Sequence, residues 1–156
     1  MWYTGQARGY SKIGYAISDD GKTFTPVLIP DHPWEGFSVM NPWVLRDTTR
    51  NVWRMWYASG ETYEPNVLCY AESADGLSWE YPDLGVVKGS NQLFEKCTVD
   101  TFCVFPDYTR DDPYSQWNLF VSDEGCHSLA DTLYVSADGR HFTSLGVAGA
   151  SGDRSS

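Results

Sequence analysis

The sequence predicts an all-β fold built from four-stranded antiparallel blades of a β-propeller, and three observations support this prediction. The first is a repeated phrase, Ser-x-Asp-Gly-x-x-aromatic, which begins at Ser18, Ser73 and Ser136, so its copies start 55 and 63 residues apart. Such spacing is typical of repeated supersecondary units. The second is an aromatic content of 15%. The third is that no segment longer than about 12 residues has the apolar period of a helix.

The repeated phrase has the chemistry of a tight turn between two strands. A short acidic side chain accepts hydrogen bonds from the backbone N–H groups just ahead of it, and glycine adopts a positive φ without strain. The aromatic residue that ends the phrase begins the next strand. We interpret Asp20, Asp75 and Asp138 as turn-forming residues, because a carboxylate that recurs in every unit is poorly placed for chemistry that belongs to one site.

The first unit is predicted to hold three strands. Residues 1–5 and 13–18 are rich in aromatic and β-branched residues and flank a polar loop over residues 6–12. A third strand follows the turn at residues 24–28. Its Pro26 indicates an edge position, because proline has no N–H to donate to a central ladder.

The second and third units repeat this order with one more strand in front. Met55-Trp56-Tyr57 repeats Met1-Trp2-Tyr3 at an offset of 54 residues. The predicted strands of the second unit are residues 41–47, 52–60, 67–73 and 79–82. Those of the third unit are residues 100–107, 117–122, 132–136 and 143–147.

We interpret residues 1–156 as a single partial β-propeller domain. It divides into part of a blade at 1–30, blades at 40–85 and 99–148, and the start of another blade at 152–156. This is about two and two-thirds blades, and closed propellers need at least about four blades. We therefore expect the chain to be a fragment of a longer protein. A two-sheet sandwich is the alternative fold, although it does not explain three copies of one turn after matching strands.

The formal net charge of −10 argues against nucleic acid or an anionic membrane as the partner. An acidic surface rich in aromatic residues suits a neutral oligosaccharide or polysaccharide, because aromatic rings stack on sugar faces and carboxylates accept hydrogen bonds from hydroxyls. An ordinary acidic surface explains the charge equally well. No run approaches the roughly 18 apolar residues of a membrane-spanning helix, and no signal peptide is visible. The oligomeric state and the localisation are not indicated.

The four cysteines do not form a recognisable metal or redox motif. Cys69, Cys97, Cys103 and Cys126 have spacings that match neither pattern. We expect buried thiols, with a disulfide between Cys97 and Cys103 as the alternative. The sequence also lacks a phosphate-binding loop, a nucleophile elbow and a His-Glu-x-x-His motif. No cofactor and no metal are expected.

The combined order of the motifs resembles the five-bladed β-propeller glycosidases, namely glycoside hydrolase families 43, 32 and 68, with family 130 alongside. The matching stretches are residues 1–24, 40–79 and 100–142. The motif order is Asn/Asp-Pro-x-Val, then Met-Trp-Tyr-x-Ser/Thr-Gly, then Tyr-Ala-x-Ser-x-Asp-Gly-x-x-Trp, and residues 40–79 contain all three motifs. The turn phrase alone also occurs in sialidase-type propellers, so the specificity comes from the order of the motifs. The resemblance does not select one family of this clan.

The resemblance implies a glycoside hydrolase-like active site in a funnel on the propeller axis. Acidic residues at the starts of successive inner strands would converge there, with two carboxylates on opposite sides of a glycosidic bond. A separation of ~5–5.5 Å selects retention and ~6.5–9.5 Å selects inversion. The general acid needs a raised pKa to hold its proton. Carried over by position, the catalytic candidates are Asp100, where the family often has its general acid, and Asp153.

Asn41 begins an inner strand at a position where the family often has an aspartate. An amide does not act as a base, so its implied role is to orient a sugar hydroxyl. This departure favours the alternatives of a non-catalytic carbohydrate-binding or interaction propeller, or an inactive fragment. Ordinary structural roles also remain open for the candidates: Asp100 as a strand cap, Asp153 as a surface residue and Asn41 as a turn residue.

Further candidates for substrate binding lie in the loops before the inner strands. His32 and Trp34 precede the second inner strand, and Glu95 precedes the third. His32 and Glu95 have the alternative of being ordinary exposed loop residues. Trp43 is a further candidate for stacking on a sugar ring, although we expect it to pack in the core or between blades. Asp47 and Asp107 are interpreted as hairpin-turn acids.

Overall fold

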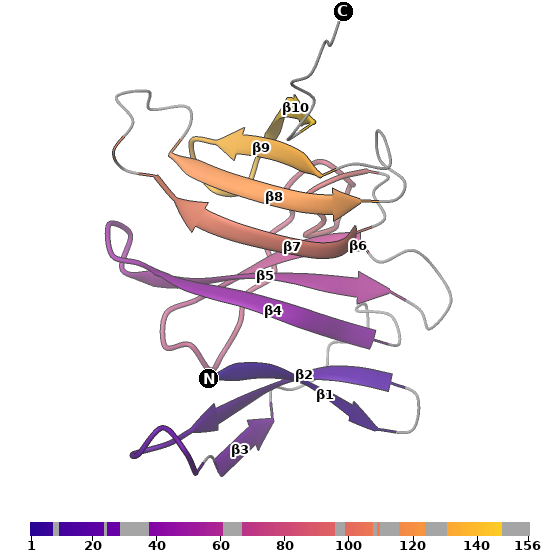
Figure 1. Ribbon diagram of the computed structural model, residues 1–156. Coiled ribbons are helices and arrows are strands. Elements are labelled where there is room, and N and C mark those ends of the chain that lie inside the picture. Colours follow the sequence, from indigo (N-terminus) through magenta and orange to yellow (C-terminus); the bar gives the residue numbers. More distant parts are fainter. Residues whose placement is uncertain are drawn as a thin grey trace, which may run out of the picture. The chain divides into compact units, whose positions relative to one another are not determined.

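A computed structural model describes residues 1–7, 10–23, 25–28, 38–60, 67–95, 99–107, 109, 116–123 and 131–147. Within these residues ten strands form three antiparallel sheets, and no helix occurs (Figure 1). The chain divides into two compact units, Met1–Lys96 and Cys97–Ser156. In every sheet the neighbouring strands are also neighbours in the sequence, which is the strand order of propeller blades. The all-β fold class predicted from the sequence is confirmed.

The first sheet has the order β1-β2-β3, with β1 at Trp2–Ala7, β2 at Tyr10–Ile17 and β3 at Thr25–Leu28. Its first two strands pair as far as Ala7↔Tyr10. The polar loop expected over residues 6–12 is therefore wrong for most of that range. Antiparallel pairing satisfies the backbone groups whatever the side chains are, so polar residues continue the hairpin.

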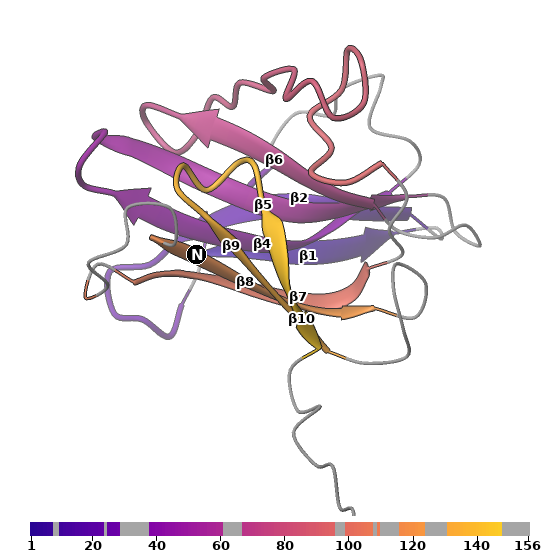
Figure 2. The ribbon, with the colours of Figure 1, turned by 90° about the horizontal axis from the view of Figure 1, so that it is seen from above.

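The second sheet has the order β4-β5-β6, with β4 at Ser38–Asp47, β5 at Val52–Gly60 and β6 at Val67–Ser73 (Figures 1 and 2). The fourth strand expected at residues 79–82 is reduced to one bridge, Glu72↔Glu80. Pro82 has no N–H with which to extend this pairing. Tyr70 N instead donates to Asn91 O at 3.0 Å. The outer edge of β6 is thus covered by two short pieces of chain.

The core of the first unit lies between its two sheets. Ile13 of β2 packs in one buried cluster with residues of the second sheet, and the half-buried Trp2 packs against that cluster. The ring centroids of Trp2 and Trp53 are 5.1 Å apart. Hydrogen bonds between described residues join the sheets near the start of β4. Ser11 N donates to Ser38 Oγ at 3.1 Å, and Asn41 N donates to Thr4 Oγ1 at 2.8 Å.

The second unit is a single four-stranded sheet with the order β10-β9-β8-β7. Its strands are β7 at Val99–Pro106, β8 at Trp117–Asp123, β9 at Thr132–Ser136 and β10 at Thr143–Val147. The side chains of Val99, Val104 and Leu119 are fully buried. This sheet has the four strands predicted for a complete blade.

The repeated phrase forms the same turn in all three sheets. In the first copy, Ser18 Oγ donates to Asp20 Oδ1 at 3.0 Å, and Gly21 N donates to Ser18 Oγ at 2.9 Å. The N–H groups of Lys22 and Thr23 both donate to Asp20 Oδ1 at 2.8 Å. Gly21 has a φ of 71°. The backbone N–H groups of Thr23 and Lys22 lower the pKa of Asp20 to about 2.

The other two copies make the same four hydrogen bonds, centred on Asp75 and Asp138. Their glycines, Gly76 and Gly139, have φ values of 78° and 72°. The N–H groups of Ser78 and Leu77 lower the pKa of Asp75 to about 2. The turn-forming role predicted for the three aspartates is confirmed, and their hydrogen bonds keep them ionised at neutral pH.

Two of the cysteines lie in the described residues. Cys69 is buried and Cys103 is half-buried, and both are thiols rather than halves of a disulfide. The buried thiol is confirmed for Cys69, whereas Cys103 is only partly covered. Cys97 and Cys126 lie outside the described residues. No helix in the described part of the chain is long and apolar enough to cross a membrane.

Candidate functional site

The start of β4 is irregular at the position where the sequence predicts a site residue. The register of β4 against β5 shifts between Met40 and Trp43, so Asn41 and Pro42 have no partner residue in β5. Asn41 has a φ of 53°, in the left-handed region. Asparagine enters this region more readily than most residues. Bulges of this kind redirect side chains and are frequent next to active sites.

The surroundings of Asn41 combine a fixed backbone with an exposed side chain. Its backbone N–H is held by Thr4 Oγ1 at 2.8 Å, across from the neighbouring sheet. The residue itself is exposed. Its side-chain amide makes no hydrogen bond among the described residues, and an amide offers both a donor and an acceptor. The position therefore presents a polar group that can bind a hydroxyl.

The first strand of the second unit has a bulge at its own predicted site residue. Val99 lies opposite Asp123 and Thr101 lies opposite Ser122, so Asp100 is the extra residue in β7. The side chain of Asp100 lies outside what the structure describes. Asn41 and Asp100 belong to different units. They share one local feature, which is a bulge near the start of the first strand of a sheet.

The remaining candidates divide between described and undescribed residues. Glu95 is exposed, in the bend that follows Leu93. His32, Trp34 and Asp153 lie outside the described residues. Among the residues that are described, no group of three His, Cys, Asp or Glu side chains is arranged to hold a metal ion.

Trp43 corrects an expectation. It is 38% exposed, so it is not a core residue, whereas packing between blades stays a prediction. Its partner in the register is Trp56 of β5, which is fully buried. The two strands differ in position, because β5 has a strand on either side and β4 is an edge strand of its sheet. An exposed indole two residues after Asn41 suits stacking on a sugar ring.

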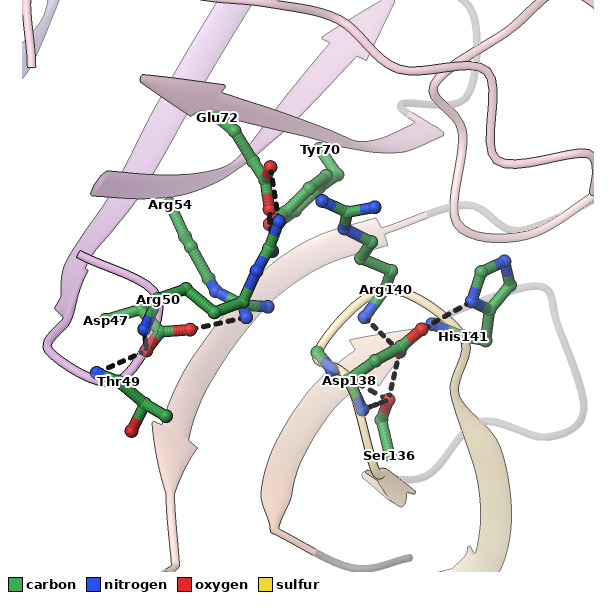
Figure 3. A network of polar contacts seen from close by, with 11 residues as sticks. Asp47, Thr49, Arg50, Arg54, Tyr70, Glu72, Ser136, Asp138, Arg140 and His141 are labelled. Atoms are coloured by element: carbon green, nitrogen blue, oxygen red, sulfur yellow. Dashed lines mark hydrogen bonds and ion pairs between the residues drawn. The ribbon is translucent and has the colours of Figure 1, made fainter. Parts of the chain in front are cut away.

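Asp47 ends β4 as a buried hairpin-turn acid, as the sequence predicts (Figure 3). Its Oδ1 accepts hydrogen bonds from the backbone N–H groups of Thr49 and Arg50, both at 3.0 Å. Its Oδ2 accepts a hydrogen bond from Arg54 Nη2. Burial alone raises the pKa of Asp47, but the hydrogen bonds from the Arg50 N–H and the Arg54 guanidinium outweigh burial and hold it below its ordinary value. Asp47 is therefore an ionised structural group and is unsuited to act as a general acid.

Two parts of this region were missed at the sequence level. The first is a contact in which Arg50 and Tyr70 both donate to the Glu72 carboxylate (Figure 3). The second is Thr4, whose hydroxyl holds the Asn41 backbone. The sequence offers one signal for Thr4. It follows Met1-Trp2-Tyr3, whereas Ala58, which has no hydroxyl, follows the second copy at Met55-Trp56-Tyr57.

No family model matches the chain. Two curated proteins of Mycobacterium tuberculosis are similar to part of it. They are Uncharacterized protein MT1551 of strain CDC 1551 / Oshkosh and Uncharacterized protein Rv1502 of strain ATCC 25618 / H37Rv. Each is 39% identical over 82 residues, which cover 46% of this chain and 26% of the relative. The matched region thus spans about a quarter of these relatives.

Solved structures match over most of the chain. A glycosyl hydrolase from Bacteroides ovatus has a TM-score of 0.60 at 17% identity, covering 92% of this chain and 44% of its own. A β-1,2-mannobiose phosphorylase from Listeria innocua, bound to β-1,2-mannobiose, has a TM-score of 0.62 at 18% identity. The match covers 86% of this chain and 35% of the phosphorylase.

A third structure comes from the GH130 family of mannoside phosphorylases, which contains glycoside hydrolases that target β-1,2-mannosidic linkages in Candida mannan. Its TM-score is 0.63 at 16% identity, covering 92% of this chain and 44% of its own. At such identities the likeness establishes the fold alone. This chain has the glycosidase-like β-propeller fold of these hydrolases and phosphorylases.

Proposed function

We propose that the whole protein acts on a carbohydrate as a glycoside hydrolase-like propeller, with paired carboxylates as its acid and base. One observation carries the proposal: a β-bulge interrupts the first strand of two sheets at the inner-strand positions Asn41 and Asp100. The fold likeness to a glycosyl hydrolase over 92% of the chain supports it. A bulge at these positions is consistent with side chains redirected toward a site.

The proposed roles follow from the chemistry of each side chain. Asp100 and Asp153 are the two carboxylates, one donating a proton to the leaving oxygen and the other serving as base or nucleophile. Asn41 orients a sugar hydroxyl through its amide and takes no part in proton transfer. Trp34, His32 and Glu95 contribute to substrate binding around these groups.

The proposed substrate class is a β-linked mannoside. Two of the three similar structures are connected by their names with β-1,2-mannosides, one as a phosphorylase and the other through hydrolases. Hydrolysis is proposed as the reaction. Phosphorolysis is the close variant, in which phosphate replaces water as the acceptor of the mannosyl group.

Product analysis tests this proposal and separates the two reactions. The whole protein would be incubated with β-1,2-mannobiose, with and without inorganic phosphate, and its products resolved by chromatography. Hydrolysis yields mannose alone in both conditions, whereas phosphorolysis yields mannose 1-phosphate only when phosphate is present. Absence of turnover with β-1,2-mannobiose and with other β-mannosides would contradict the proposed enzyme.

Substitution of the carboxylates tests the residue roles. We expect Asp100→Asn and Asp153→Asn each to lower kcat by about 10²–10⁴-fold, because an amide does not transfer a proton. Asp19→Asn is the matched control, since it makes the same change of charge at an exposed residue in the first turn. Full activity in Asp100→Asn would remove Asp100 from the mechanism.

A non-catalytic carbohydrate-binding propeller is the second candidate function. The observation that favours it is Asn41, which stands where the resembling glycosidases often have an acid. This candidate predicts saturable glycan binding without turnover. Calorimetric titration with β-1,2-mannobiose, run beside the product analysis, distinguishes it from the enzyme.

A further inference from the structure

The bulge near the start of β4 takes the backbone N–H of Asn41 out of the ladder with β5, so this N–H needs another partner. Asn41 has no partner residue in β5. Its N–H is satisfied by Thr4 Oγ1 at 2.8 Å, from β1 of the neighbouring sheet. Backbone N–H groups left out of a ladder need such a partner. The left-handed φ of 53° at Asn41 is thus supported by a side chain from another sheet.

The repeat does not require a hydroxyl at position 4. Met1-Trp2-Tyr3 recurs as Met55-Trp56-Tyr57, and the residue that follows the second copy is Ala58. Ala58 is fully buried in β5. The second unit therefore builds this strand with a buried alanine at the place that Thr4 has in the first unit.

The strand that carries Thr4 is firmly placed. Thr4 pairs with Ile13 of β2, which is buried in the core of the unit. On the preceding residue, the Tyr3 ring lies so close to Gly14 that a Cβ added there would be 2.5 Å from the ring. The buried hydrogen bond from Ser11 N to Ser38 Oγ joins the same two sheets at 3.1 Å. The Thr4 hydroxyl is thus held on a fixed scaffold.

We propose that Thr4 is a positioning residue of the carbohydrate site. It holds the Asn41 backbone in its left-handed conformation, so that the Asn41 amide meets a sugar hydroxyl in a fixed orientation. This inference rests on the proposed function, because it assigns the ligand of Asn41 as a carbohydrate. It adds a residue from β1 to a site that the sequence placed at the starts of the inner strands.

A double-mutant cycle tests this inference. Thr4→Val, Thr4→Ser, Asn41→Ala and the double variant Thr4→Val/Asn41→Ala would be prepared in the whole protein, and the Kd for β-1,2-mannobiose measured by calorimetry. We expect Thr4→Val to weaken binding about fivefold to tenfold, and Thr4→Ser to stay within about twofold, because serine keeps the hydroxyl. In the Asn41→Ala background, Thr4→Val should change the Kd by less than about twofold.

The structural readouts separate positioning from stability. We expect the melting temperature of Thr4→Val to change by less than about 2 °C, because the bond from Asn41 N to Thr4 Oγ1 is exposed and water can replace it. The backbone amide resonance of Asn41 should nevertheless shift in a ¹⁵N-labelled sample. Normal binding by Thr4→Val, with weakened binding by Asn41→Ala, would overturn this inference and leave the proposed function standing. An equal loss from Thr4→Val in both backgrounds would also overturn it. Absence of mannobiose binding by the unmodified protein would overturn the mannoside assignment and this inference together.

Discussion

The turns at Ser18 and Ser73 have the same sequence pattern and the same hydrogen bonds but different surroundings. Gly21 of the first turn lies in open space, with nothing within 4 Å of an added Cβ. At Gly76 of the second turn, an added Cβ would lie 3.3 Å from both the Trp2 and the Trp53 ring. The phrase therefore specifies the turn locally, whereas its neighbours decide how much tertiary packing depends on it.

Two ion pairs near the β4–β5 hairpin, Arg54–Asp47 and Arg50–Glu72, also differ in how far they are buried. Arg54 and Asp47 are buried, with side chains 3% and 4% exposed, whereas Arg50 of the Arg50–Glu72 pair is 44% exposed. We expect Arg54→Ala to lower the free energy of unfolding by about 3–5 kcal/mol, because it leaves a buried carboxylate without its cation. Arg50→Ala should cost less than about 1 kcal/mol. Urea denaturation of both variants measures the difference, and equal losses would contradict the role given to burial.

The glycines of the two turns provide the next largest contrast. We expect Gly21→Ala to lower the free energy of unfolding by about 1 kcal/mol, because a positive φ is strained for alanine. Gly76→Ala carries the same strain and also requires Trp2 and Trp53 to shift, so we expect a loss of about 2 kcal/mol. Denaturant titration of the two variants is a matched test. A loss at Gly21 as large as that at Gly76 would show that packing around the second turn contributes nothing.

The smallest effect expected concerns acid stability. The pKa values of Asp20 and Asp75 are lowered from 3.8 to about 2 in the folded protein. A lowered folded-state pKa contributes stability above the unfolded value, and that stability is lost as the pH falls through the folded value. The melting temperature should therefore fall between about pH 4 and pH 2, and Asp75→Asn should reduce this dependence. A dependence unchanged in Asp75→Asn would contradict the contribution of that turn.

The parts of the fold that were predictable depend on local sequence. The three turns follow from Ser, Asp and Gly at fixed spacing, and β6 follows from a run of strand-forming residues between turn signals. The missing outer strand at residues 79–82 was not predictable in this way. Its place beside β6 is taken partly by Asn91, through backbone pairing over a separation that local propensity does not encode.

The candidate site shows the same division. The sequence located Asn41 and Asp100 near the starts of strands, but the bulges depend on the register between paired strands. The exposure of Trp43 depends on the position of β4 in its sheet. The bond from Asn41 to Thr4 joins residues 37 apart in two sheets. These features arise from tertiary pairing, which a single sequence does not specify locally.

The most direct test of the proposed site is a crystal structure of the whole protein with β-1,2-mannobiose bound. We expect the Asn41 amide and the Asp100 carboxylate both to contact the sugar. We also expect a second carboxylate across the glycosidic bond, at ~5–5.5 Å from Asp100 for retention or ~6.5–9.5 Å for inversion. A disaccharide bound elsewhere, with Asn41 and Asp100 directed away from each other, would contradict it.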